Sequence, residues 1–216
     1  MTVRIRRYEP RDREAIRQLA CDTADRGAPV ERFFPDRGVI ADLLTAYYTD
    51  YEPDATWVAD TDGVVIGYVT GCVDTRRCQR ISACRIIPGS IWRGVQRGAL
   101  SRRETWQILR MGWRTFWRGG YNRTVSLAEY PAHLHLNIRE GFRGQGIASQ
   151  LMARFLEQAR QARRRGVHAS VRGDNAPACR FFERMGFSAI GRYPLVLPED
   201  PDDRPHETVI YGKSLS

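Results

Sequence analysis

Long apolar runs are missing from this sequence of 216 residues. None approaches the roughly 18 residues that a membrane-spanning helix requires, and the amino terminus from Met1 to Arg6 lacks the apolar core of a signal peptide. These absences exclude a membrane-spanning protein and lead us to expect a cytoplasmic one. The 42% hydrophobic and 27% charged residues are ordinary for a folded globular chain, and the length suits one domain over residues 1–216.

Lysine is nearly absent as well. Lys213 is the only lysine, so almost all of the 34 basic residues are arginine, and the formal net charge is +9. One interpretation is the arginine bias of a G+C-rich coding genome. The other is a basic surface that attracts an anionic partner, either nucleic acid or a polyphosphate cofactor. Composition does not decide between them.

Paired cysteine motifs are also lacking. The odd number of cysteines and the absence of any C-x-x-C pair favour free thiols. Three of the cysteines are evenly spaced, but no histidine lies near them in the sequence, so we expect no metal site. The five are Cys21, Cys72, Cys78, Cys84 and Cys179.

The hydrophobic pattern predicts an α/β (α+β) fold in which about seven strands are combined with helices. A helical insert at about 82–130 separates the third strand from the fourth. Strands are predicted at about 3–6, 56–59, 64–73, 134–138, 167–171, 188–196 and 207–213, and helices at 12–19, 37–51, 147–164 and 175–185.

Within the insert, tryptophan and arginine alternate at helical spacing between about 90 and 118. We interpret the arginines as a solvated face and the aromatic residues as core or as a partner surface, a homodimer contact included. Binding to nucleic acid or to a membrane surface is the less favoured alternative. The aromatic face includes Trp106, Trp113 and Trp117, and the basic face includes Arg103, Arg110 and Arg114.

The segment Arg143-Gly144-Gln145-Gly146-Ile147-Ala148-Ser149 lies between a predicted strand and a predicted helix. A helix amino terminus offers unpaired N–H groups and a partial positive charge, which suit a phosphate group. The two glycines let the backbone approach a ligand closely, and Arg143 adds a permanent cation. The segment therefore predicts a pyrophosphate-binding loop.

Two common phosphate-binding motifs fit this loop poorly. It is not a Walker A motif, because no Gly-Lys-Ser/Thr follows. A dinucleotide-binding G-x-G-x-x-G motif would need a third glycine where Ser149 stands, and an acidic residue about 20 positions further on.

A third pattern fits better. Arg143-x-x-Gly146-x-Ala148 matches the Q/R-x-x-G-x-G/A signature of the GCN5-related N-acetyltransferases (GNAT), and the stretch from Asn175 to Phe187 resembles the N-x-x-A-x-x-F-Y-E-K-x-G-F segment of that family. The resemblance covers most of the chain apart from about 82–130. The stretch from Tyr130 to Leu136 is similar to bacterial members related to the acetyltransferase-like domains of some O-GlcNAcases.

This resemblance implies a GNAT fold, with a mixed sheet flanked by helices, and acetyl-CoA as cosubstrate without a metal. The predicted cofactor-binding residues follow from the family motif by position. The pantetheine arm would lie along one strand, the pyrophosphate would lie in the glycine loop, and Asn175 would contact the cofactor, cap its helix, or do both. The full set of predicted cofactor-binding residues is Leu136, Asn137, Ile138, Arg143, Gly144, Gln145, Gly146, Ile147, Ala148, Ser149, Asn175 and Phe182.

The implied reaction is attack of an amine on the thioester, which requires a general base. His133 and His135 alternate along one strand and so point to the same face, and histidine titrates in the useful range. The structural alternative is that one or both are packed histidines. Glu129, acting through water, is a further candidate, whereas His168 and His206 are interpreted as structural.

Phe182 departs from the family pattern, because a tyrosine usually stands there and phenylalanine cannot protonate the departing thiolate. Tyr193, Cys179 or a water serves instead, or coenzyme A leaves as the thiolate. The sequence therefore favours an N-acetyltransferase that acts on a primary amine of a small molecule or a protein. A non-catalytic acyl-CoA-binding module is the alternative, and a basic nucleic-acid-binding protein is a weaker one.

Overall fold

The fold is built on a mixed seven-stranded sheet with strand order β1-β2-β3-β4-β5-β7-β6. The computed structural model describes residues 2–23, 36–98, 106, 110, 125–195 and 206–215. Among the strands of these described ranges, only β4 and β5 pair in parallel, and the other neighbouring strands are antiparallel. The strands are β1 (Arg4–Arg7), β2 (Trp57–Thr61), β3 (Val64–Cys72), β4 (Ala132–Ile138), β5 (Gly166–Arg172), β6 (Ser188–Leu195) and β7 (His206–Ser214).

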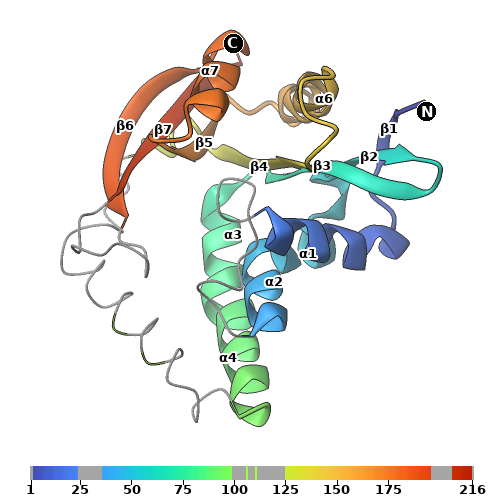
Figure 1. Cartoon of the computed structure of the whole chain (residues 1–216). Coiled ribbons are helices and arrows are strands. Elements are labelled where there is room, and N and C mark those ends of the chain that lie inside the picture. Colours follow the sequence, from blue (N-terminus) through green and yellow to red (C-terminus); the bar gives the residue numbers. More distant parts are fainter. Residues whose placement is uncertain are drawn as a thin grey trace.

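Helices cover both faces of this sheet (Figure 1). One face carries α1 (Arg13–Asp22), α2 (Arg37–Ala46), α3 (Thr75–Ile81) and α4 (Ile87–Gln96), and the other carries α6 (Ile147–Gln161) and α7 (Ala176–Arg184). Four short helical turns complete the described elements: η1 (Pro10–Asp12), η3 (Tyr47–Tyr51), η4 (Pro53–Ala55) and η5 (Ser82–Ile86). The predicted strands and helices outside the insert are confirmed to within a few residues.

The helical insert starts earlier than the sequence pattern indicated. The helical run begins at Thr75 and continues through η5 into α4, which ends at Gln96. Asp74 caps it, because its side chain accepts a hydrogen bond from the N–H of Arg77 at 3.1 Å. Most of the predicted tryptophan and arginine helix lies outside the described residues. Beyond Gly98 the structure describes only Trp106 and Arg110 of it, and both are helical and exposed.

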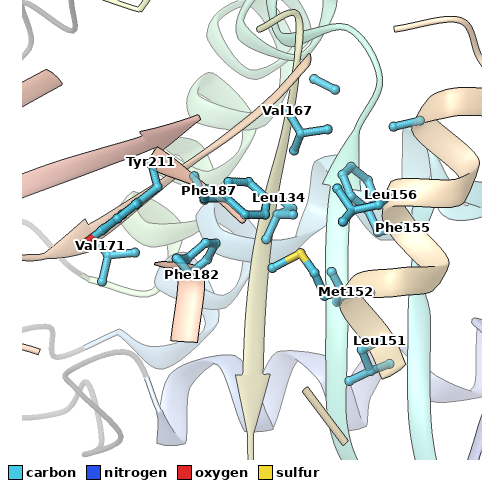
Figure 2. Close-up of a cluster of buried hydrophobic side chains, with 14 of the residues drawn as sticks. Leu134, Leu151, Met152, Phe155, Leu156, Val167, Val171, Phe182, Phe187 and Tyr211 are labelled. Carbon is cyan, nitrogen blue, oxygen red and sulfur yellow. The ribbon is translucent and has the colours of Figure 1, made fainter. Parts of the chain in front are cut away.

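Helix α6 provides the centre of the core, as its apolar stripe predicted. Leu151, Met152 and Phe155 are completely buried against β3 and β4. Figure 2 shows Leu134 of β4 between the α6 side chains and the aromatic group of α7 and β7. Gly71 of β3 permits this packing, because a Cβ there would lie 2.3 Å from the Phe155 ring. Strand β4 is therefore held on this face by α6.

Candidate active site

The predicted pyrophosphate loop joins the end of β4 to the start of α6. The first backbone hydrogen bond of this helix runs from the Gln150 N–H to the Gly146 carbonyl at 3.2 Å. The N–H groups of the preceding residues Ile147, Ala148 and Ser149 are therefore not used by the helix. Gly144 and Gly146 have φ values of 80° and 76°, and a β-carbon added to either would have no atom within 4 Å. The loop from Arg143 to Gly146 is exposed and lies at the positive end of a 15-residue helix.

The neighbouring strands β4 and β5 diverge toward this loop. They pair only at Ala132 with Val167 and at His133 with His168. Arg139 donates its N–H to Ile66 of β3 at 2.8 Å, and backbone direction alternates along a strand. The backbone of Asn137 therefore faces β3, while the backbone groups of Leu136 and Ile138 face the gap.

Within this predicted strand segment, two polar atoms are already occupied. The Asn137 side chain donates a hydrogen bond to the Tyr68 hydroxyl at 2.6 Å. The Ile138 carbonyl accepts one from Arg143 Nε at 3.2 Å. Leu136 is thus the residue of the three whose backbone faces the gap without a described partner. Arg143 is held at the gap by its own strand.

Asn175, which precedes α7, and Phe182 within α7 lie on the opposite side of the gap. The Asn175 side chain accepts a hydrogen bond from the Ala178 N–H at 3.2 Å, which confirms its helix-capping role. Phe182 is buried and packs edge-to-face against Phe187, with ring centroids 5.2 Å apart. Its ring forms part of the apolar wall behind β5.

His133 and His135 project from the same face of β4, as predicted, with ring centroids 5.6 Å apart. Tyr48 of η3 lies against both, at 5.8 Å from His133 and 5.6 Å from His135. His168 of β5, which was interpreted as structural, joins this group because its ring lies 5.5 Å from His133. Its Nδ1 is 2.9 Å from the Tyr130 carbonyl oxygen, which fits the structural interpretation.

Both ring nitrogens of His133 have polar neighbours. Its Nε2 lies 2.8 Å from the Tyr48 hydroxyl. Its Nδ1 lies 2.9 Å from Thr75 Oγ1 and 3.1 Å from Cys72 Sγ. Burial raises the pKa of Tyr48 well above its ordinary value, so this phenol keeps its proton. His135 is exposed on the same strand, and Glu129 is exposed in the turn before it.

The site includes residues that the sequence did not single out, among them Tyr48 and Thr75. Cys72, Cys78 and His133 also come together, with one sulfur or nitrogen of each within 4.8 Å of the others. Burial raises the pKa of Cys72, whereas the hydrogen bond from Cys72 lowers the pKa of Cys78. No sequence signal reveals the group, because 61 residues separate Cys72 from His133. The sequence argument against a metal therefore does not hold in three dimensions.

The candidates for protonating a thiolate lie on the far side of the β4–β5 gap. Cys179 on α7 has its sulfur 3.7 Å from the Arg172 carbonyl oxygen. Tyr193 is buried on β6. A further hydroxyl, that of Tyr211, donates to Glu183 Oε1 at 2.9 Å.

Comparison with known proteins agrees with this geometry. The model of the acetyltransferase (GNAT) family matches residues 28–187, and the chain belongs to that family. The crystal structure of SsHAT is similar over 100% of both chains, with a TM-score of 0.75 and 27% identity. That of yncA from Salmonella typhimurium with its cofactor acetyl-CoA has a TM-score of 0.60 and 16% identity over 100% of this chain and 95% of that one.

A curated relative is also an acetyltransferase by name. The Bacillus subtilis (strain 168) protein "Putative phosphinothricin acetyltransferase YwnH" is 30% identical over 99 residues, which are 46% of this chain and 55% of the relative. This chain therefore spans about half the length of that relative. The family match therefore places the chain among the GNAT acetyltransferases. The narrower likeness to O-GlcNAcase-related proteins stays a prediction.

No helix in the described ranges is both long and apolar enough to cross a membrane.

Proposed function

We propose that this chain is an acetyl-CoA-dependent N-acetyltransferase that acetylates a primary amine of a small molecule or a protein. The observation that supports this most is the position of the open N–H groups of α6. They lie at the end of β4, where β4 has separated from β5. The gap offers strand-like backbone groups to an extended arm, and the helix end offers donors to a diphosphate.

The residues of this region fit the cosubstrate. The N–H groups from Arg143 to Ser149 would bind the pyrophosphate, because nothing in the described structure fills the space over Gly144 and Gly146. The backbone of Leu136 and Ile138 would contact the pantetheine, with Asn137 and Asn175 beside it. Phe182 would pack near the thiol end. When bound, acetyl-CoA supplies the thioester that an amine attacks.

The acceptor amine must lose a proton before it attacks, since an ammonium has no lone pair. His135 is the best placed of the three candidates, because it is exposed on β4 and projects to the same face as His133 and Tyr48. His133 has polar neighbours at both ring nitrogens, so we assign it the role of positioning Tyr48 and His135 rather than that of the base. Glu129, exposed before β4, is the alternative through water.

The tetrahedral intermediate carries a negative oxygen that needs a hydrogen-bond donor. The N–H of Leu136 faces the gap and is the donor from β4. The departing sulfur has no tyrosine at position 182. Tyr193, Cys179 or a water protonates it instead, or coenzyme A leaves as the thiolate.

Two measurements test the proposal together. Calorimetry should show binding of acetyl-CoA by the purified protein, and a thiol-release assay should show turnover with members of a panel of primary amines. Absence of acetyl-CoA affinity would overturn the cofactor assignment. Affinity without thiol release would instead support the non-catalytic acyl-CoA-binding module, which the loss of the tyrosine at position 182 favours.

The single-domain organisation, a cytoplasmic location and homodimer formation stay predictions. Binding to nucleic acid stays the weaker alternative.

A further inference from the structure

Three side chains that could bind a metal converge beside the histidine strand. Cys72 is the last residue of β3, Cys78 lies in α3, and His133 lies in β4. One sulfur or nitrogen atom from each lies within 4.8 Å of the others. Cys72 is completely buried and Cys78 is 6% exposed. The two sulfurs are thus shielded from bulk water, His133 is half-buried, and the three side chains come from three different elements.

The distance between two of these ligand atoms is close to the one that a tetrahedral zinc ion would require. Zinc–sulfur bonds of about 2.3 Å and zinc–nitrogen bonds of about 2.0 Å place neighbouring sulfur and nitrogen ligands about 3.6 Å apart in a tetrahedron. The Cys72 Sγ to His133 Nδ1 distance is 3.1 Å. Separating these atoms by about half an ångström, within reach of side-chain rotation, would admit the ion.

The chemistry of the donors selects a soft or borderline divalent ion. Two thiolates and one imidazole are ligands that zinc prefers over magnesium or calcium. The Glu52 carboxylate interacts electrostatically with both cysteines and adds negative charge to the region. Glu52 is fixed there, because it accepts hydrogen bonds from the Val73 N–H at 2.8 Å and the Tyr47 hydroxyl at 2.7 Å.

We propose that Cys72, Cys78 and His133 form a zinc-binding site, with the fourth position taken by water. The ion would join the end of β3 and the start of β4 to the first helix of the insert. It would also fix the tautomer of His133, because an imidazole bound through Nδ1 keeps its proton on Nε2. That nitrogen lies 2.8 Å from the Tyr48 hydroxyl oxygen, which would accept the hydrogen bond. This replaces our sequence-based expectation of no metal.

The inference does not depend on acetyl transfer, so it is tested without an activity assay. The full chain is purified under reducing conditions, stripped with a chelator, and titrated with zinc against a chromophoric competitor. We expect one zinc per chain and a higher thermal unfolding temperature. Absence of uptake at one equivalent, or uptake that leaves the unfolding temperature unchanged, would overturn the site.

Variants assign the ligands. We expect Cys78→Ser to lower the zinc affinity about tenfold or more. Cys84→Ser, which removes an exposed thiol six residues further along the same helical run, should leave it unchanged. Equal affinity of Cys78→Ser and the unaltered chain would contradict the proposal.

Cobalt gives a readout that does not require a variant to fold. Substitution of cobalt into the unaltered chain should produce the strong visible absorption of a tetrahedral ion and the near-ultraviolet charge-transfer bands of thiolate ligands. The weak spectrum of an octahedral oxygen-bound ion would overturn the assignment. The assignment would also be overturned if Cys72 and Cys78 were found as a disulfide and its reduction did not restore the cobalt bands.

Discussion

The rings of Phe182 on α7 and Tyr211 on β7 lie nearly parallel, with centroids 5.7 Å apart and an interplanar angle of 19°. Figure 2 shows them in the aromatic group beside β5, together with Phe187. Burial raises the pKa of Tyr211, and its hydroxyl donates to Glu183 rather than standing free. Phe182 stands where the family usually has a proton-donating tyrosine, and its ring has no donor. The hydroxyl of the neighbouring Tyr211 is already used by Glu183.

Restoring the family's tyrosine should reveal whether this matters. If protonation of the thiolate limits turnover, Phe182→Tyr should raise kcat about tenfold or more, with the KM for acetyl-CoA unchanged. Steady-state kinetics with a saturating amine measures the effect. The neighbouring Phe181→Tyr, which adds a hydroxyl to a half-buried ring of the same helix, is the control. An unchanged kcat in Phe182→Tyr would show that the missing hydroxyl is irrelevant.

Gly146 allows a matched test of the phosphate loop. Gly146 and Gly63 have similar φ values of 76° and 82°, and a β-carbon would meet no atom at either position. Alanine should cost both variants about 1–2 kcal/mol of stability through left-handed strain. Only Gly146→Ala, at the start of α6, should weaken acetyl-CoA binding, by about tenfold, in calorimetry.

Gly63 lies in the turn between β2 and β3, so its variant isolates the backbone strain. Equal affinities in the two alanine variants, or full affinity in the bulkier Gly146→Trp, would remove the basis for placing the diphosphate at this helix.

His135 should be needed for turnover but not for cofactor binding. We expect His135→Ala to lower kcat about 10²–10⁴-fold, the usual contribution of a general base, while the acetyl-CoA dissociation constant stays the same. His206→Ala is the control, because that ring on β7 lies near Asp174, with Nδ1 and Oδ2 3.6 Å apart. A larger loss in Glu129→Gln than in His135→Ala would assign the base to Glu129 instead.

Asp12 should support the fold through the buried ion pair with Arg6, whose Nη1 and Nη2 donate to the carboxylate at 2.6 and 2.8 Å. Burial by itself would raise the pKa of Asp12. The hydrogen bonds from the Arg6 side chain and from the Glu9 backbone N–H outweigh the effect of burial, so the pKa of Asp12 is lowered. The resulting stability is complete above the unfolded-state pKa of about 4 and is lost as the pH falls through the lower folded-state value.

Removing the carboxylate tests this assignment. Asp12→Asn should cost about 3 kcal/mol or more at neutral pH, because Arg6 is left with a buried, partly unpaired charge. Denaturant unfolding at several pH values measures it, and the cost should shrink toward low pH. The exposed Glu9→Gln, whose carboxylate lies 3.9 Å from Arg6, should change stability by less than about 1 kcal/mol.

Much of the fold and part of the site follow from local pattern. The apolar residues of α6, which include Leu151 and Phe155, recur at helical spacing in the sequence and are buried as predicted. The glycine loop and the Asn175 cap are also local, because each depends on hydrogen bonds between residues a few positions apart. Such features need no knowledge of distant strands.

The surroundings of His133, in contrast, are formed by residues far apart in the sequence. The β3–β4 register sets Cys72 directly opposite His133, while η3 brings Tyr48 and α3 brings Thr75 and Cys78. A one-residue slip of that register would turn every side chain of β4 to the opposite face. Sequence spacing contains no such information, since strand pairing is settled by packing on both faces of the sheet. Local pattern therefore predicts the cofactor loop, whereas tertiary structure alone creates the histidine and cysteine group.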